Sequence, residues 1–418
     1  MMATGSGKTK AAMYAISQID TWKLLLICVP SLELVEQWEA DVRLFYPDVS
    51  IIKCGSPYRG HKELLKSLTQ ARFPEQVVVI STYDSAQGDY YMSKWRLAKS
   101  EQFAMICDEV HNMGAPKSQC LMELNPAYRI GLSATPRRNF DEIGSEKILD
   151  FYHQNTFEFS IKDAQREHYL VEYQYRILPC AMPEDDWELY KTFSREILQL
   201  QHTLEQEGNE KAQLRLRQRI EGRYRDRAKL LKKNDQKAQT LQTIFDEIPP
   251  TARVLIYGDD LHHLDEIGQE LDHMGKYYFK YTGELDAQKE RPTILKEFRQ
   301  GIRKTLLAVG CLDEGIDIPA CDVAVFISSS TSERQFIQRR GRVLRVAPGK
   351  TSAWIYDYLL YPILSARTND DERRLALSMI DAQYRRINLM VEDAINGIQE
   401  RQKLDQFLSQ RRLNPYDF

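Results

Sequence analysis

The sequence predicts an α/β protein with two parallel-sheet domains in tandem, a helical insertion between them and a helical C-terminal tail. Short continuous apolar runs alternate with helical patterns over residues 1–160 and again over about 241–366. Such alternation is typical of parallel strands that are covered by helices on both faces. Residues 184–240 contain no strand-like run and are densely charged, and the pattern from about 367 onward is helical.

The domain boundaries follow from these changes of pattern. We expect a first domain at 1–160, a crossing segment at 161–183 with a short helix and a long alternating strand, a charged helical insertion at 184–240, a second domain at 241–366 and a tail at 367–418. The predicted strands are Leu24–Val29, Val77–Ser81, Ala104–Cys107, Tyr128–Leu132, Arg253–Tyr257, Thr305–Val309, Val323–Ile327 and Ala353–Tyr356. The insertion is predicted to form an antiparallel helix pair. The tail is predicted to align six apolar residues on one helical face, namely Ile380, Tyr384, Ile387, Val391, Ile395 and Ile398.

Composition excludes several classes of protein. The net charge of −3 over 418 residues means that any nucleic-acid site must be a local basic surface. The seven cysteines include no CxxC pair, so neither a zinc site nor a disulfide framework is indicated. Cys28 and Cys107 fall in apolar runs and are expected to be core thiols, which fits a reducing, cytoplasmic setting. No apolar run approaches the length of a membrane span, about 18 residues.

A glycine-rich loop occupies residues 2–9, MATGSGKT. Gly5 and Gly7 let the backbone curl so that its N–H groups, with those of Thr4 and Ser6, point at phosphate oxygens. Lys8 can reach the β- and γ-phosphates, and Thr9 can place its hydroxyl on Mg²⁺. The following helix directs its positive end at the same phosphates. Taken alone, the loop could be a chance glycine-rich turn.

The chain begins at this loop, whereas such loops usually follow a buried strand. We therefore expect that either the natural reading frame is longer or another segment takes the place of that strand. Upstream in-frame sequence encoding a hydrophobic strand would support the first alternative, and an immediate upstream stop codon would contradict it.

A second motif, Ala104–His111 (AMICDEVH), ends an apolar strand with two acids. The carboxyl end of a strand is where open α/β sheets place ligands. Asp108 is expected to hold Mg²⁺ with Thr9, Glu109 to orient the attacking water, and His111 to sense the γ-phosphate side. Without the glycine-rich loop, this segment could equally be a strand that ends in a solvated acidic turn.

With both motifs, the chain resembles the DExH branch of helicase superfamily 2 over about residues 2–346. It is most similar to the group of xeroderma-pigmentosum-B-like helicases, phage recombination helicases and type I and III restriction motor subunits. The resemblance implies two RecA-like domains that hydrolyse ATP between them. The DEAD-box RNA helicases match less well, because the acidic motif is DEVH and no upstream glutamine motif is visible.

The resemblance assigns roles to further residues in order along the chain. Segments PSLELVEQW, STY and YTG look like family motifs that touch the nucleic-acid backbone, and SATP looks like the motif that couples hydrolysis to domain movement. GCLDEGIDIP resembles the motif that links the arginines to the nucleic acid. The residues implied are Pro30, Ser31, Ser81, Thr82, Tyr83, Thr282 and Gly283 for nucleic acid, Ser133, Ala134 and Thr135 for coupling, and Gly315 and Asp317 for the nucleotide.

QRRGRVLR at 338–345 looks like the arginine-finger motif. Arg342 and Arg345 are three apart, one turn of a helix, and forked guanidinium groups suit the charge that develops on a transferring phosphoryl group. Gln338 is expected on the same face. Alone, the motif could be a solvated basic helix end.

The favoured function is an ATP- and Mg²⁺-dependent helicase or translocase, with DNA favoured over RNA. A partner protein could bind the tail or the insertion, and no membrane is implied. One alternative is the motor subunit of a restriction or defence complex whose nuclease lies on a partner. Another is a nucleic-acid-binding scaffold whose ATPase is impaired because the strand before the loop is missing. The basic stretch 211–233 could grip duplex phosphates or act as a wedge, or could be a solvated helical face.

Overall fold

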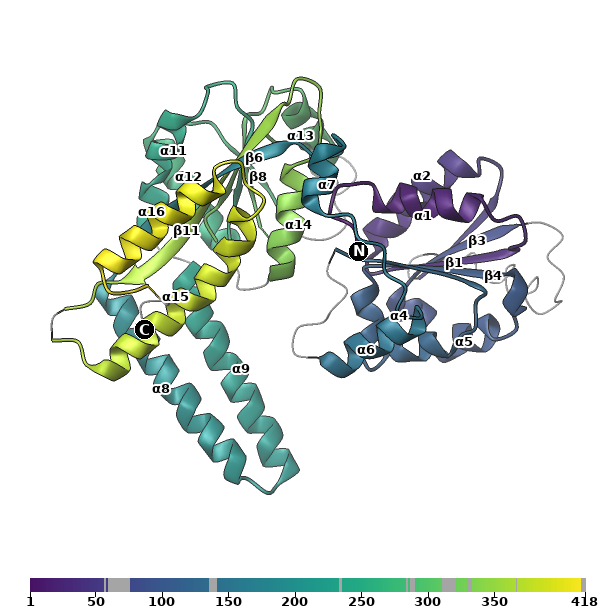
Figure 1. The fold of residues 1–418 in the computed structure, drawn as a ribbon, viewed down its shortest axis with the longest axis horizontal. Coiled ribbons are helices and arrows are strands. Elements are labelled where there is room, and N and C mark those ends of the chain that lie inside the picture. The colour runs from purple at the N-terminus through teal and green to yellow at the C-terminus, as the bar shows by residue number, and fades with distance from the viewer. Residues whose placement is uncertain are drawn as a thin grey trace. The chain divides into compact units, whose positions relative to one another are not determined.

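The computed structural model describes residues 1–55, 58, 76–134, 141–232, 235–282, 285, 290–309, 321–328, 333–365 and 367–414. The chain divides after Leu170 into two compact units, each built on a parallel sheet with flanking helices (Figure 1). The predicted fold class of two tandem parallel-sheet domains is therefore confirmed.

Unit 1 contains a five-stranded parallel sheet in the order β2-β3-β1-β4-β5. Its strands are β1 (Leu24–Val29), β2 (Ser50–Cys54), β3 (Val77–Thr82), β4 (Phe103–Asp108) and β5 (Tyr128–Leu132), and its helices are α1 (Lys8–Ser17), α2 (Leu32–Phe45), α4 (Tyr83–Ala86), α5 (Asp89–Trp95), α6 (Glu142–Phe151) and α7 (Ile161–Arg166). Three short 3-10 turns lie at Ser100–Gln102, Val110–Gly114 and Ser118–Glu123.

Both faces of this sheet are covered, as the continuous apolar runs predicted. Helices α1 and α2 pack on the face that carries Leu25, Ile27 and Val29, whereas α4, α5 and α6 pack on the face of Leu24, Leu26 and Cys28. Cys28 lies beside Cys107 in the register of β1 and β4, and both are fully buried, as expected of core thiols. The side-chain hydrogen bond with Cys107, and then burial, raise the pKa of the Cys28 thiol well above its ordinary value.

Unit 2 contains a six-stranded parallel sheet in the order β6-β11-β10-β7-β9-β8. Its strands are β6 (Glu172–Met182), β7 (Val254–Tyr257), β8 (Phe279–Tyr281), β9 (Thr305–Ala308), β10 (Val323–Phe326) and β11 (Ser352–Pro362). Its helices are α8 (Glu184–Gln206), α9 (Glu210–Lys232), α10 (Asp235–Gln239), α11 (Leu241–Glu247), α12 (Leu261–His273), α13 (Glu290–Arg299), α14 (Glu333–Val343), α15 (Asp370–Val391) and α16 (Gly397–Gln410). The long alternating strand expected in the crossing segment is β6, which pairs with β11 along its whole length.

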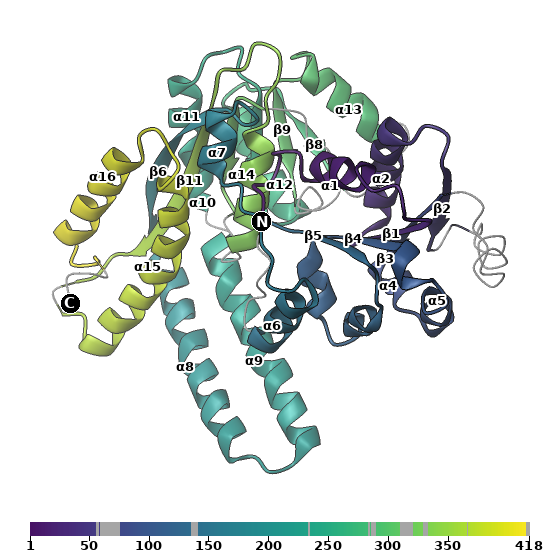
Figure 2. The same ribbon diagram turned by 45° about the vertical axis from the view of Figure 1, so that its right-hand side comes forward.

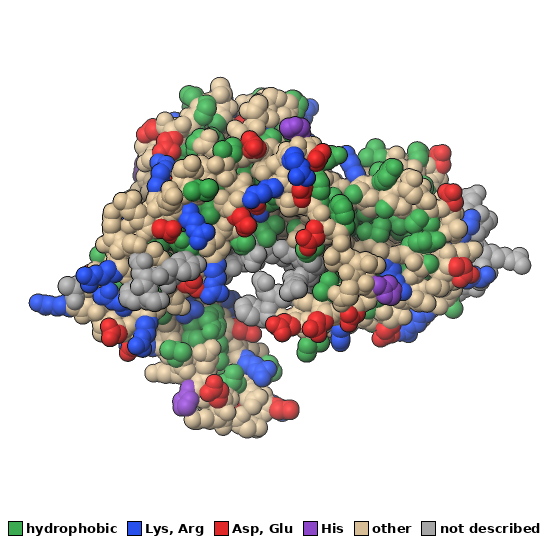
Figure 3. Space-filling view, in the orientation of Figure 1, with side chains coloured by type: hydrophobic (Ala, Val, Ile, Leu, Met, Phe, Trp, Pro, Cys, Tyr) green, Lys and Arg blue, Asp and Glu red, His purple; other side chains and the backbone are tan. Residues whose placement is uncertain are grey.

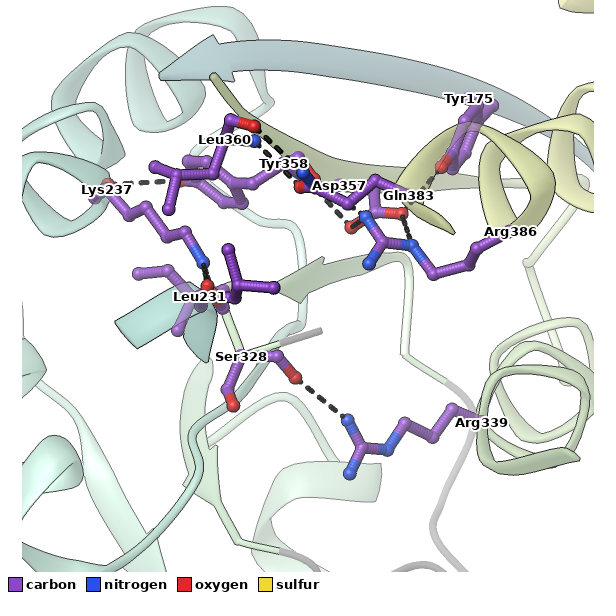
Figure 4. Close-up of polar contacts among 11 residues, drawn as sticks. Tyr175, Leu231, Lys237, Ser328, Arg339, Asp357, Tyr358, Leu360, Gln383 and Arg386 are labelled. Carbon is purple, nitrogen blue, oxygen red and sulfur yellow. Dashed lines mark hydrogen bonds and ion pairs between the residues drawn. The ribbon is translucent and has the colours of Figure 1, made fainter. Parts of the chain in front are cut away.

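The insertion forms the predicted helix pair, α8 and α9, which lie side by side and extend away from the sheet of unit 2 (Figures 1 and 2). Lys237, just after the pair, is buried and anchors it (Figure 4). Its Nζ donates to the carbonyls of Leu231, at 2.6 Å, and Ile327, at 3.1 Å. The anchor therefore joins the end of α9 to the end of β10.

The tail departs from the prediction of one continuous apolar face. Ile380, Tyr384, Ile387 and Val391 are buried on α15, but Ile395 and Ile398 are 54% and 74% exposed. The helix breaks between α15 and α16 because Asn396 turns to the sheet and bonds both the N–H and the carbonyl of Tyr175, each at 2.9 Å. This segment covers the edge strand β6, which would otherwise expose unpaired backbone groups.

Charge is distributed rather than gathered on the face drawn in Figure 3, where acidic and basic side chains are interspersed. This agrees with the small net charge of the chain. Along the described ranges, every helix is too short or too polar to cross a lipid bilayer.

Candidate functional site

The glycine-rich loop runs directly into α1. Gly5 and Gly7 have φ of 85° and 92°, a left-handed conformation that residues with a Cβ rarely adopt. Ser6 folds the loop back by donating from its hydroxyl to the Ala3 carbonyl at 2.7 Å. Gly7 is the N-cap of α1 and supplies no side-chain bond, so the first N–H groups of the helix remain available for an anion.

Two side-chain atoms of this loop are buried without a hydrogen-bond partner among the described residues. They are Nζ of Lys8 and Oγ1 of Thr4. A buried unpaired ammonium is costly, and a phosphate placed over the loop would satisfy it. The predicted loop residues therefore form a cradle that fits the phosphates of a nucleotide, with Thr9 as the second residue of α1.

Asp108 ends β4 and is held from three sides. Trp38 on α2 donates from Nε1 to Oδ2 of Asp108 at 2.9 Å, and the Glu109 N–H donates to Oδ1 at 2.9 Å. The Tyr83 hydroxyl donates to the Asp108 main-chain carbonyl at 2.8 Å. Burial and then the charge of Glu109 raise the pKa of Asp108, while Trp38 and Lys8 oppose the rise.

Glu109 and His111 follow at the same sheet edge. Glu109 has φ of 45°, an uncommon left-handed conformation for a residue with a Cβ, and such conformations concentrate at functional sites. The Glu109 carboxylate lies 3.5 Å from Nδ1 of His111, which is 4% exposed. Glu109 and His111, which are two residues apart in the DEVH motif, therefore also contact each other in the structure.

These residues also fit a magnesium ion. Asp108 and the hydroxyl of Thr9 would be its protein ligands, since Mg²⁺ takes hard oxygen donors and binds through one or two protein groups plus substrate phosphates. The observation that supports the fit is the buried acidic pair, whose like charges a divalent cation would neutralise.

The residues expected to contact nucleic acid lie at the carboxyl ends of β1, β3 and β8. Ser31 follows Pro30 as the N-cap of α2, yet its hydroxyl forms no cap bond and is buried without a partner among the described residues. Thr82 caps α4 by accepting from the Ser85 N–H at 3.3 Å. Ser81, Thr82, Tyr83 and Thr282 are buried, whereas Ser31 is partly exposed as a residue although its hydroxyl is buried.

Beside β5, unit 1 contains a cavity of about 590 Å³. Lys8 is the one loop residue between Thr4 and Thr9 that lines it, and most of the other lining side chains are apolar, including Met2, Ala12 and Leu132. Ser133 also lines it, and its main-chain carbonyl accepts a hydrogen bond from the Met2 N–H at 3.3 Å. An apolar lining does not suit a triphosphate, so the cradle over α1 is the better phosphate site.

In unit 2, α14 carries Gln338 and Arg342, four residues apart on one helical face. Arg345 departs from the prediction, because α14 ends at Val343 and Arg345 lies beyond it. Arg345 remains near through a bond from its N–H to the Arg342 carbonyl at 3.4 Å, and burial lowers the pKa of its guanidinium. Ala134 is described beside Ser133, whereas Thr135, Gly283, Gly315 and Asp317 lie outside the described residues.

Helix α9 presents basic side chains along its outer face. Lys211, Arg215, Arg225 and Lys229 are exposed, form no ion pair with any described residue, and recur at spacings that place them within about 40° of one line. We call these four residues the basic stripe. It spans about 27 Å of the helix. Arg223, by contrast, turns toward α8 and pairs with Glu196 at 2.6 Å.

Sequence reasoning missed the role of Trp38, the last residue of the segment PSLELVEQW. The signal was available in part, because Trp38 shares the buried face of α2 with Val35 and Val42. A buried tryptophan usually finds an acceptor for its N–H. That the acceptor is Asp108, 70 residues away, follows only from the fold.

Family models match both units. Residues 1–138 match the type III restriction enzyme, res subunit, and residues 236–347 match the helicase conserved C-terminal domain. The two matched ranges contain the glycine-rich loop, the DEVH motif and α14.

Individual relatives agree with the family models. The chain is 24% identical over 362 residues to a DNA 3'-5' translocase XPB2 of Sulfurisphaera tokodaii, covering 82% of this chain and 74% of that protein. It is 26% identical over 353 residues to a putative DNA 3'-5' helicase Rad25 of Haloarcula marismortui, and spans 47% of that protein. An ATP-dependent type ISP restriction-modification enzyme, LlaBIII, solved bound to DNA, shares the fold over 94% of this chain and 28% of that one, with a TM-score of 0.59 at 17% identity.

Proposed function

Because the chain belongs to helicase superfamily 2, in the group related to XPB and type III restriction enzymes, we propose that it is an ATP-driven DNA helicase or translocase. The observation that carries the proposal is the phosphate cradle. In it the buried Lys8 ammonium has no hydrogen-bond partner among the described residues, and its charge opposes the rise in the pKa of Asp108. A lysine, a hydroxyl and an acidic pair are the groups that nucleotide hydrolysis requires.

Each residue has a distinct part in the proposed reaction. Lys8 and the N–H groups of the loop bind and orient the β- and γ-phosphates. Thr9 and Asp108 would hold Mg²⁺, which would supply positive charge against the negative charge that develops on the phosphates. Glu109 accepts a proton from the attacking water, and its contact with His111 fixes the carboxylate.

Arg342 of the second unit would supply a further positive charge to stabilise the transferring phosphoryl group. Because this guanidinium belongs to the second unit, hydrolysis would depend on closure of the two units. Each cycle of ATP binding and hydrolysis would then be coupled to a movement of the units. Gln338 lies on the same face of α14 and is assigned to the same closing surface.

DNA is proposed to bind through its phosphates. The unpartnered Ser31 hydroxyl, the Thr82 segment and the basic stripe of α9 offer donors to the backbone without reading bases. Binding should therefore be largely independent of sequence and strongly dependent on salt.

The test measures ATP hydrolysis by the intact chain with single-stranded DNA, duplex DNA and RNA. We expect stimulation by DNA, and a fall of roughly 100-fold or more in Glu109→Gln because the general base is lost. Glu123→Gln is the matched control, since Glu123 forms an exposed ion pair with Arg96 away from the site. Folded protein without hydrolysis on any polymer would contradict the proposal and favour a nucleic-acid-binding scaffold.

A second candidate function is the motor subunit of a restriction or defence complex. It is favoured by the match of residues 1–138 to a type III restriction subunit. It predicts that the ATPase acts with a nuclease on a partner chain. DNA cleavage by the complex isolated from its native host, lost in Glu109→Gln, would support it, and DNA unwinding with no associated cleavage would favour the free helicase.

A further inference from the structure

Arg340, in the middle of α14, reaches the end of the tail helix α15. Its Nη1 donates to the Leu389 carbonyl at 2.7 Å and lies 3.2 Å from Oδ2 of Asp393. Leu389 belongs to the last turn of α15, where carbonyls lack partners within the helix and carry the negative end of its dipole. The Arg340 and Asp393 side chains are only 6% and 19% exposed, so the ion pair is shielded from water.

A second contact joins the same two helices about one turn away. The Arg386 guanidinium on α15 lies 4.8 Å from the centre of the Phe336 ring on α14. Asp357 on β11 fixes this guanidinium at 3.1 Å, and the Tyr358 carbonyl accepts from it at 2.7 Å (Figure 4). Phe336 and Arg340 are four residues apart and therefore share a face of α14.

The face of α14 that contacts α15 is opposite to the face that carries Arg342, the proposed arginine finger. At 100° per residue, Arg342 lies about 200° around the helix from Arg340. Gln338, four residues before Arg342, lies with it. A rotation or shift of α14 that loosened Arg340 would therefore displace Gln338 and Arg342 by a similar amount.

We propose that α15 is a positioning element for the arginine-finger helix, with Asp393 and Arg386 as positioning residues for ATP hydrolysis. The proposal rests on the proposed function in assigning Arg342 to the transition state. Both positioning residues act through α14, by fixing Arg340 and Phe336. Misplacement of a catalytic group by about 1 Å can cost up to roughly 100-fold in rate, so a loosened α14 should slow turnover without weakening the binding of ATP.

Asp393→Asn tests this, because it removes the charge opposite Arg340 and keeps the shape. We expect kcat for DNA-stimulated ATP hydrolysis to fall about tenfold, with KM for ATP changed by no more than about twofold. Asp393→Glu should restore most of the rate. The matched control is Asp381→Asn, which breaks a more exposed ion pair with Arg385 on the same helix and should leave both constants unchanged. Equal kcat values in the Asp393→Asn and Asp381→Asn variants would overturn the proposal.

Hydrogen exchange provides a readout that needs no turnover. In Asp393→Asn without nucleotide, backbone amides of α14 should exchange faster than in the wild-type chain, while those of α12 should not change. If the wild-type chain hydrolyses no ATP, the proposed function fails, but faster exchange confined to α14 still supports the positioning contact.

If Asp393→Asn does not fold, Tyr173→Phe replaces it. The Tyr173 hydroxyl lies 3.3 Å from Nη1 of Arg340 and donates to the Met390 carbonyl, so its removal weakens the same contact while the ion pair stays. A folded Tyr173→Phe variant in which α14 exchanges at the wild-type rate would overturn the proposal.

Discussion

Trp38 donates a 2.9 Å hydrogen bond from its indole nitrogen to Oδ2 of Asp108, which joins the helix after β1 to the carboxylate that ends β4. The bond favours the ionised carboxylate and opposes the effect of burial on its pKa. Trp38, a residue of the segment proposed to contact nucleic acid, thus helps to set the charge of the proposed magnesium ligand.

Trp38→Phe should therefore raise the pKa of Asp108 further, because the indole donor is lost while burial remains. A hydrogen bond to a charged group contributes about 1.5–3 kcal/mol, so we expect kcat/KM to fall about tenfold or more at neutral pH and the acid limb of the pH–rate profile to move to higher pH. Trp95→Phe is the control, since Trp95 is equally buried but donates to the Ala86 carbonyl. Identical pH profiles for the two variants would contradict this role.

Ser31 and Thr82 are both N-cap residues, but only Thr82 forms a side-chain cap bond. Thr82→Ala should lower the free energy of unfolding by about 1 kcal/mol, whereas Ser31→Ala should leave it nearly unchanged. Ser31→Ala should instead weaken DNA binding severalfold if its hydroxyl meets a phosphate. Thermal unfolding and fluorescence anisotropy on the same samples separate the two effects, and unaltered DNA affinity in Ser31→Ala would remove Ser31 from the binding surface.

The basic stripe predicts the salt dependence of DNA binding. Replacing Arg215 and Arg225 together by Gln should reduce the slope of log Kd against log salt by about two, because about one counterion is released for each phosphate contact. Arg223→Gln should not change the slope, since Arg223 is paired with Glu196 on α8. Equal slopes for all three proteins would mean that the stripe is only a solvated face.

Lys237 predicts a pH-dependent stability. Burial lowers its pKa from 10.5 to about 8, so between these values the unfolded chain binds more protons than the folded one. The contribution of Lys237 to stability should therefore rise from pH 8 toward pH 10, by on the order of 2 kcal/mol. The cost of Lys237→Met, measured by urea unfolding at several pH values, should grow over this window, and a cost independent of pH would contradict the lowered pKa.

Much of the fold could be predicted from hydrophobic pattern alone. The continuous runs that became β1, β3 and β4 are recognisable because both faces of the sheet are covered at these strands. β2 and β8 were missed, since β2 is a half-exposed edge strand and β8 has three residues. The break between α15 and α16 depends on Asn396 binding Tyr175, a contact between residues 221 apart that no local pattern reveals.

The candidate site was predictable for a different reason. The glycine-rich loop and the DEVH acids are local arrangements whose chemistry can be recognised within a few residues. The contacts that hold them, such as Trp38 with Asp108 and Arg340 with α15, connect distant segments and require the fold. Arg345 was placed on a helix because its spacing from Arg342 is helical, but α14 ends two residues earlier.

The central claim is that one nucleotide is bound by Lys8 and cleaved with the help of Arg342. Single-turnover ATP hydrolysis on saturating DNA, measured together with nucleotide affinity, tests it in Lys8→Ala and Arg342→Ala. We expect Lys8→Ala to lose nucleotide binding, and Arg342→Ala to bind nucleotide normally while its rate falls about 1,000-fold or more. An Arg342→Ala variant that hydrolyses ATP at the wild-type rate would contradict the account.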